Sequence, residues 1–147
     1  MISEPNLIII ADDDSDDCLF LSSVLLSMPI ELSVIIVPNG ERLINMLKAV
    51  SPQFIFLDIN MPKKSGFDAL RQIRSNKNSP QPTIIMCSTS SSSIDLRMSQ
   101  ELGADLYVVK PNNLKHLSTM VDEILKRDWA GTANKRIPES FLLSHVQ

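Results

Sequence analysis

Three absences narrow the classes to which this sequence can belong. Positive charge is not in excess, because 14 Lys and Arg stand against 17 Asp and Glu and give a net charge of -3, so a basic surface for nucleic acid is not expected. The N-terminus carries no basic region, and its longest early apolar run, residues 7–11, is too short for a signal-peptide core or a membrane span. We therefore expect a cytoplasmic protein without membrane insertion and without direct contact to nucleic acid.

Cysteine is scarce as well. Cys18 and Cys87 are the two cysteines of the sequence, and neither has a partner at the spacing of a metal site, which predicts two buried free thiols. What is present is the composition of an ordinary globular domain, with 44% hydrophobic and 21% charged residues in a chain of 147. That length fits one domain and is sufficient to bury a sizeable core.

Short apolar runs rich in β-branched residues alternate with segments of helical length. None of the runs alternates polar with apolar residues, which indicates strands that are covered on both faces, as in a parallel sheet. The expected strands are 7–11, 32–37, 54–57, 83–87 and 106–109, and the expected helices are 15–28, 41–49, 67–74, 95–102 and 114–126. Five such units joined by right-handed crossovers predict a three-layer, doubly wound α/β fold with a five-stranded parallel sheet. Any site is expected at the carboxyl ends of the strands.

The end of the chain lies outside these five units. The sequence therefore divides into a domain over residues 6–128 and a C-terminal tail over residues 129–147. The tail contains the apolar residues Phe141, Leu142 and Leu143, which we expect to dock on the domain or to extend an interface.

The stretch LIIIADDDSDD, residues 7–17, leads from an apolar strand into five carboxylates. Two carboxylates about 4 Å apart at a partly wet site repel each other by roughly 4 kcal/mol, so the run needs compensation. Asp14, Asp16 and Asp17 are expected to be solvated residues at the start of the next helix, where the helix dipole favours negative charge. That helix carries the apolar residues Leu19, Phe20, Val24 and Leu26. Asp12 and Asp13 are expected instead to lie beside a cation.

In a parallel sheet the residues just past each strand meet at one edge. Here those residues are Asp12 and Asp13 after the first strand, Asp58 after the third, Ser88 after the fourth and Lys110 after the fifth. Oxygen donors at this density suit Mg²⁺, which binds one or two carboxylates, a carbonyl and several waters. Lys110 and Ser88 can then bind phosphoryl oxygens, and the Asp58 carboxylate can attack phosphorus to form an aspartyl phosphate.

These motifs resemble those of the receiver domains of two-component response regulators, in particular single-domain members of the chemotaxis type. The resemblance rests on the acidic pair Asp12-Asp13, on DINMPKKSG with Asp58, on Ser88-Thr89 and on YVVKP at 107–111, all in the family's order. It covers about residues 6–128. It implies a flavodoxin-like (βα)5 fold with strand order 2-1-3-4-5.

The resemblance implies the acceptor and the metal ligands. Asp58 would accept a phosphoryl group from a phosphohistidine of a sensor histidine kinase or of a phosphotransfer protein. Mg²⁺ would be held by Asp13, Asp58 and the backbone carbonyl of Asn60, and Asp12 would act mainly through water.

The resemblance also implies how phosphorylation is sensed. Ser88 and Lys110 would bind the phosphoryl oxygens, and Ser88 and Tyr107 would move in a two-state switch. The peptide bond between Lys110 and Pro111 would be cis. Thr89 stands where the family often has Ala. The larger threonine side chain would add bulk on the path that Tyr107 would take.

By this resemblance the protein is a regulator and not an enzyme, apart from its own phosphorylation and dephosphorylation. We expect a stand-alone receiver, since 147 residues leave no room for an effector domain, and its state would be read by an unknown downstream protein or through a homodimer. Two alternatives stay open. One is a Mg²⁺-dependent phosphatase of the haloacid dehalogenase type, which needs a second Asp where Asn60 stands, and the other is a receiver that acts as a scaffold without phosphorylation.

Overall fold

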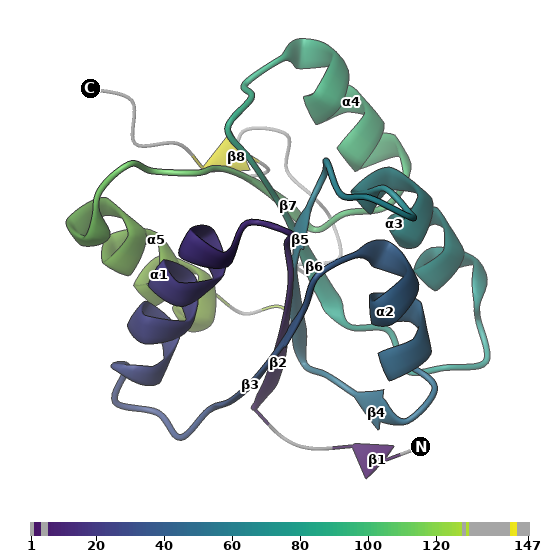
Figure 1. The fold of residues 1–147 in the computed structure, drawn as a ribbon, viewed down its shortest axis with the longest axis horizontal. Coiled ribbons are helices and arrows are strands. Elements are labelled where there is room, and N and C mark those ends of the chain that lie inside the picture. Colours follow the sequence, from purple (N-terminus) through teal and green to yellow (C-terminus); the bar gives the residue numbers. More distant parts are fainter. Residues whose placement is uncertain (1, 4–5, 128, 130–141, 144–147) are drawn as a thin grey trace.

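The computed structural model describes residues 2–3, 6–127, 129 and 142–143. Within them one six-stranded parallel sheet is covered by helices on both faces (Figure 1). Its strands are β2 (Leu7–Ala11), β3 (Ser33–Val37), β5 (Phe54–Asp58), β6 (Thr83–Ser88), β7 (Leu106–Val109) and β8 (Leu142–Leu143). The helices are α1 (Ser15–Leu26), α2 (Gly40–Met46), α3 (Gly66–Ser75), α4 (Ser93–Glu101) and α5 (Leu114–Lys126). No helix in the described ranges is both long and apolar enough to cross a membrane.

The strands are ordered β3-β2-β5-β6-β7-β8 across the sheet, and each neighbouring pair is parallel. The five expected strands thus lie in the order 2-1-3-4-5, and the flavodoxin-like fold is confirmed. Three short strands were not predicted. They are β8 at the outer edge of the sheet and the separate two-stranded pair of β1 (Ile2–Ser3) and β4 (Val50–Ser51).

The apolar runs are continuous because both faces of the central strands are buried. In β2, Ile8 and Ile10 belong to the core under α1 and α5, whereas Ile9 belongs to the core under α2 and α3. All three side chains are at most 2% exposed. Figure 1 shows α1 and α5 on one face of the sheet and α2, α3 and α4 on the other. Alternate side chains of one strand therefore supply two cores, and every position has to be apolar.

Helix α1 begins as the acidic run predicted. Asp14 is its N-cap and accepts hydrogen bonds from the backbone N–H groups of Asp16 and Asp17 at 2.9 and 3.1 Å. Cys18, Val24 and Leu25 of α1 are buried in the core beneath this helix, and Leu21 packs against them. Three of the four apolar residues named for this helix, Leu19, Phe20 and Leu26, are at least half exposed.

The tail returns to the sheet. Leu142 and Leu143 pair with Tyr107 and Val108 of β7, so two of the three apolar tail residues lie at the edge of the sheet. Phe141 lies outside the described residues. At the start of the tail, Trp129 packs edge-on against Phe54 with 6.4 Å between ring centroids.

Candidate functional site

The strand ends converge as the topology requires. The Asp12 N–H donates to the carbonyl of Val37 at 3.1 Å, and the Lys110 N–H donates to the carbonyl of Ser88 at 2.7 Å. Asp58 is the last residue of β5, paired with Cys87 of β6. Backbone pairing thus fixes where these side chains begin, and the sheet brings residues 12, 58, 88 and 110 to one edge.

Three carboxylates cluster there. One oxygen each from Asp12, Asp13 and Asp58 lies within 4.8 Å of the other two, with Asp12 and Asp58 buried and Asp13 exposed. At that separation each ionised pair repels by roughly 3 kcal/mol at an effective dielectric constant near 20. Hard oxygen donors gathered this closely are the ligand set that a divalent cation requires, so the cluster is a candidate metal site.

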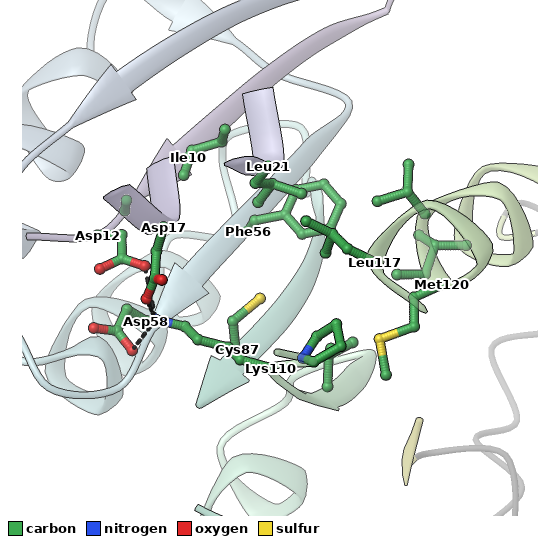
Figure 2. A pocket seen from close by; sticks show the side chains of 15 residues that line it. Ile10, Asp12, Asp17, Leu21, Phe56, Asp58, Cys87, Lys110, Leu117 and Met120 are labelled. Atoms are coloured by element: carbon green, nitrogen blue, oxygen red, sulfur yellow. Dashed lines mark hydrogen bonds and ion pairs between the residues drawn. The ribbon is translucent and has the colours of Figure 1, made fainter. Parts of the chain in front are cut away.

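The pKa of Asp58 is shifted by its burial and by the neighbouring charges. Burial raises the pKa of Asp58 to about 6; the Lys110 ammonium opposes this rise, and the charges of Asp12 and Asp13 add to it. A cavity of about 60 Å³ beside the carboxylate is walled largely by apolar side chains, among them Leu21 and Phe56 (Figure 2). Apolar walls leave little water to solvate the charge, which is why burial is the largest cause of the shift.

Lys110 provides the positive charge of the site. Its Nζ lies 2.8 Å from Asp12 Oδ2, 2.8 Å from Asp17 Oδ2 and 3.4 Å from Asp58 Oδ1. Figure 2 shows the lysine reaching these three carboxylates, and Lys110 follows directly after the end of β7. Burial lowers the pKa of Lys110, but its hydrogen bonds to Asp12 and Asp17 and the charge of Asp58 outweigh burial and hold the pKa above its usual value. The amine is therefore an ammonium at any physiological pH.

Asp17 is the site residue that the sequence analysis missed. It was expected to be solvated, yet its carboxylate is bonded to Lys110 and its side chain is only 38% exposed. The signal was present in the helical period, because Asp17 precedes the inward-facing Leu21 by four residues and so lies on the same stripe of α1.

Ser88 and Tyr107 form a separate group at the end of β6. Ser88 is 2% exposed, and its hydroxyl accepts the N–H of Ser90 at 3.0 Å. Tyr107 is fully buried, and its hydroxyl donates to the carbonyl of Ser90 at 2.7 Å. Both residues therefore hold the same loop. The side chain of Thr89 is exposed, so its bulk does not keep Tyr107 from the inward position.

The loop after Asp58 is closed by a glycine. The Gly66 N–H donates to the Ile59 carbonyl at 2.8 Å, and a Cβ at Gly66 would clash with the backbone oxygen of Asp58. Gly66 thus lets the start of α3 lie directly against the acceptor residue, which explains its place in DINMPKKSG. Asn60, the expected carbonyl ligand, lies in this loop and is exposed.

One expectation for this site is wrong. None of the described peptide bonds is cis, so the bond between Lys110 and Pro111 is trans. The trans form is the lower in energy for X–Pro bonds, by roughly 0.5–1 kcal/mol, and Lys110 reaches its three carboxylates in that form.

The two thiols are buried and free, as predicted. Burial raises the pKa of Cys18 to about 11 and that of Cys87 to about 12. Although Cys87 pairs with Asp58 across the sheet, it stays a neutral thiol at physiological pH and is not a nucleophile of this site.

The chain is similar to known proteins in both sequence and fold. A family model for the response regulator receiver domain matches residues 8–122. The response regulator Rcp1 of Synechocystis sp. is 30% identical over 127 residues, which cover 82% of this chain and 86% of Rcp1. The transcriptional regulatory protein CpxR of Escherichia coli is 35% identical over 122 residues, 83% of this chain and 50% of CpxR. The chain therefore spans about half the length of that relative.

Solved structures agree with these matches. The Mn²⁺-bound form of Rcp1 superposes with a TM-score of 0.75 at 30% identity, covering 87% of this chain and 96% of that one. The phosphorylated cyanobacterial phytochrome response regulator RcpA also gives a TM-score of 0.75, at 27% identity, with 81% and 90% covered.

Proposed function

Because the chain belongs to the response regulator receiver family, we propose that it accepts a phosphoryl group on Asp58 in two-component signalling. The observation that carries the proposal is the position of Asp58 between carboxylates and an ammonium. Asp12 and Asp13 lie within 4.8 Å of it, and Lys110 Nζ lies at 3.4 Å. Receivers are signalling regulators, so the chemistry would be limited to the protein's own phosphorylation and dephosphorylation.

An oxygen of Asp58 would be the nucleophile. A bond forms between this oxygen and the phosphorus of a phosphohistidine, and the bond from phosphorus to the imidazole nitrogen breaks, with the electron pair leaving on the imidazole. The carboxylate must be ionised to attack, which its pKa of about 6 allows at neutral pH. The Lys110 ammonium would neutralise charge on the phosphoryl oxygens, the main requirement of such a transfer.

The donor set around Asp58 fits Mg²⁺. Asp13, Asp58 and the backbone carbonyl of Asn60 would hold the ion, with Asp12 acting through water, and all of these are hard oxygen ligands. When bound, the ion supplies positive charge that offsets the repulsion of the carboxylates and the charge of the phosphoryl oxygens. A Mn²⁺-bound form of the relative Rcp1 has been solved, which supports the binding of a divalent ion by this chain.

Ser88 and Tyr107 would report the phosphorylation. The Ser88 hydroxyl accepts from Ser90, and the Ser90 carbonyl accepts from Tyr107. A Ser88 hydroxyl that turns to the phosphoryl group gives up the Ser90 N–H, so the change reaches the loop that holds Tyr107. We expect a shift between two arrangements of this loop and not a change of fold.

The donor would be a sensor histidine kinase or a phosphotransfer protein that docks beside α1. Leu19 of α1 and Ile36 of β3 are 62% and 48% exposed, and they line a groove together with Asp12 and Asp13. Exposed apolar side chains grouped next to a reactive site are typical of a surface for a protein partner. A donor bound there would bring its phosphohistidine to the acidic edge of the sheet.

The phosphorylated form would be read by a downstream protein or by a second copy of the chain. Ile94 and Met98 of α4 and Leu114 of α5 are exposed apolar residues that could serve either contact. A donor charged from ATP acts inside the cell, so the proposal also places the protein in the cytoplasm.

Incubation with acetyl phosphate and MgCl₂ tests the proposal. Intact-mass spectrometry should show the addition of one phosphoryl group, absent from Asp58→Asn and retained by Asp68→Asn, a control at an exposed carboxylate of α3. A wild-type protein that stays unmodified, with either acetyl phosphate or a phosphohistidine donor, would favour the scaffold alternative. Labelling that survives in Asp58→Asn would show that another residue is the acceptor.

A further inference from the structure

We infer that Asp17 is a positioning residue for Lys110: it holds the ammonium beside Asp58 when a cation occupies the carboxylate cluster. This inference rests on the proposed function, because the value of a held ammonium is the binding of phosphoryl oxygens. It deepens that function by giving a role to a residue outside the acceptor and metal ligands.

The geometry of Lys110 carries the first step. An ammonium has three donors, and here two of them meet carboxylate oxygens at 2.8 Å, one on Asp12 and one on Asp17. The approach to Asp58 is longer, at 3.4 Å. The Lys110 ammonium is therefore held mainly by two carboxylates, Asp12 after β2 and Asp17 in α1. Its contact with the acceptor Asp58 is the longest of the three.

Only one of these anchors is independent of the metal site. Asp12 and Asp58 both belong to the group of three carboxylates close enough to share an ion, and Asp17 does not. A cation in that group draws on the negative charge of Asp12 and Asp58 and repels the nearby ammonium. Asp17 keeps its full charge for Lys110, so it is the contact that persists in the metal-loaded protein.

Asp17 is also held in place on its own side. Its backbone N–H donates to the N-cap Asp14 at 3.1 Å, and Leu21, four residues on, packs into the core under α1. The lysine side chain it contacts is only 18% exposed, so water competes weakly for the pair. Asp16, in the same first turn of α1, is exposed to solvent and offers a control with equal charge.

A double-mutant cycle on the full chain tests the inference. The rate of phosphorylation by acetyl phosphate in saturating Mg²⁺ should fall about three- to fivefold in Asp17→Asn, the range of a partly exposed ion pair, and less than twofold in Asp16→Asn. In a Lys110→Met background, Asp17→Asn should have no further effect, and Asp17→Glu should restore part of the wild-type rate. Equal effects of the two Asn variants, or an undiminished effect without Lys110, would overturn the inference.

A second readout does not depend on phosphorylation. In ¹H–¹⁵N spectra of the Mg²⁺-loaded protein, the Lys110 ammonium should give a signal protected from exchange, and Asp17→Asn should lose it while Asp16→Asn keeps it. An Asp17→Asn protein that keeps the signal would refute the inference. If the wild type takes no phosphoryl group, the proposed function fails and the ammonium signal alone decides the role of Asp17.

Discussion

Asp58 is expected to destabilise the metal-free protein at neutral pH, so replacing it with Asn should increase stability. Its pKa is raised from an ordinary 3.8 to about 6 in the folded protein, which means that folding favours the protonated acid. Each pKa unit corresponds to about 1.36 kcal/mol, so the ionised form costs up to roughly 3 kcal/mol of folding free energy. The side chain is only 11% exposed, so solvent screening removes little of this amount.

The sign of the effect defines the pH window. Above pH 6 the carboxylate is charged in both the folded and the unfolded chain, and the full cost is present. Between pH 6 and 3.8 the folded protein takes up its proton first, so the cost shrinks, and below 3.8 it is gone. The advantage of Asp58→Asn over the wild type should therefore be largest at pH 7–8 and close to zero below pH 4.

Urea unfolding in EDTA, followed by the fluorescence of Trp129, is the assay. Trp129 is the single tryptophan of the chain, and its contact with Phe54 places it against the core. Asp68→Asn serves as the control, because its carboxylate is 59% exposed and should matter little at any pH. A destabilised Asp58→Asn protein at pH 8, or a gain that does not change between pH 8 and 4, would refute the reasoning.

Two further perturbations test the surroundings of the site. Leu19→Asp should slow phosphotransfer from a phosphohistidine protein at least fivefold, on the scale of one lost apolar contact at an interface, and leave labelling by acetyl phosphate unchanged. Leu26→Asp, at an equally exposed position on the far end of α1, is its control, and equal slowing by both variants would contradict the docking surface. Gly66→Ala should lower the free energy of unfolding by about 1–3 kcal/mol, since its Cβ would overlap the backbone oxygen of Asp58. An unchanged urea midpoint would show that the loop relaxes without cost.

Much of the fold could be predicted because the central strands are continuous apolar runs. Ile8, Ile9 and Ile10 are apolar in succession, and such a β-branched run is typical of a strand that is covered on both faces. The strand ends then follow from topology, which is why Asp12, Asp58 and Lys110 could be brought together from sequence alone. Asp14 was equally readable, since an Asp just before a helix is a common N-cap.

The errors arose where local pattern was ambiguous. Helix α1 carries apolar residues nearly all round, so Leu19 and Phe20 looked as suitable for the core as Cys18 and Leu21. Only packing against α5 and the sheet selects the inward stripe, and with it the direction of Asp17. Strand β8 is two residues long, which is too short to show any periodicity. Its position depends on pairing with the edge of β7, which lies far away in the sequence.

That edge has a consequence for how the protein behaves at high concentration. An uncovered parallel strand exposes a row of N–H and C=O groups on which a strand of another molecule can build. Beyond Tyr107 and Val108 the sheet ends in Leu142 and Leu143, and a border of two residues is a poor template for further strands. The tail thus gives this side of the sheet the protection from aggregation that other α/β proteins obtain with charged or proline-bearing edges.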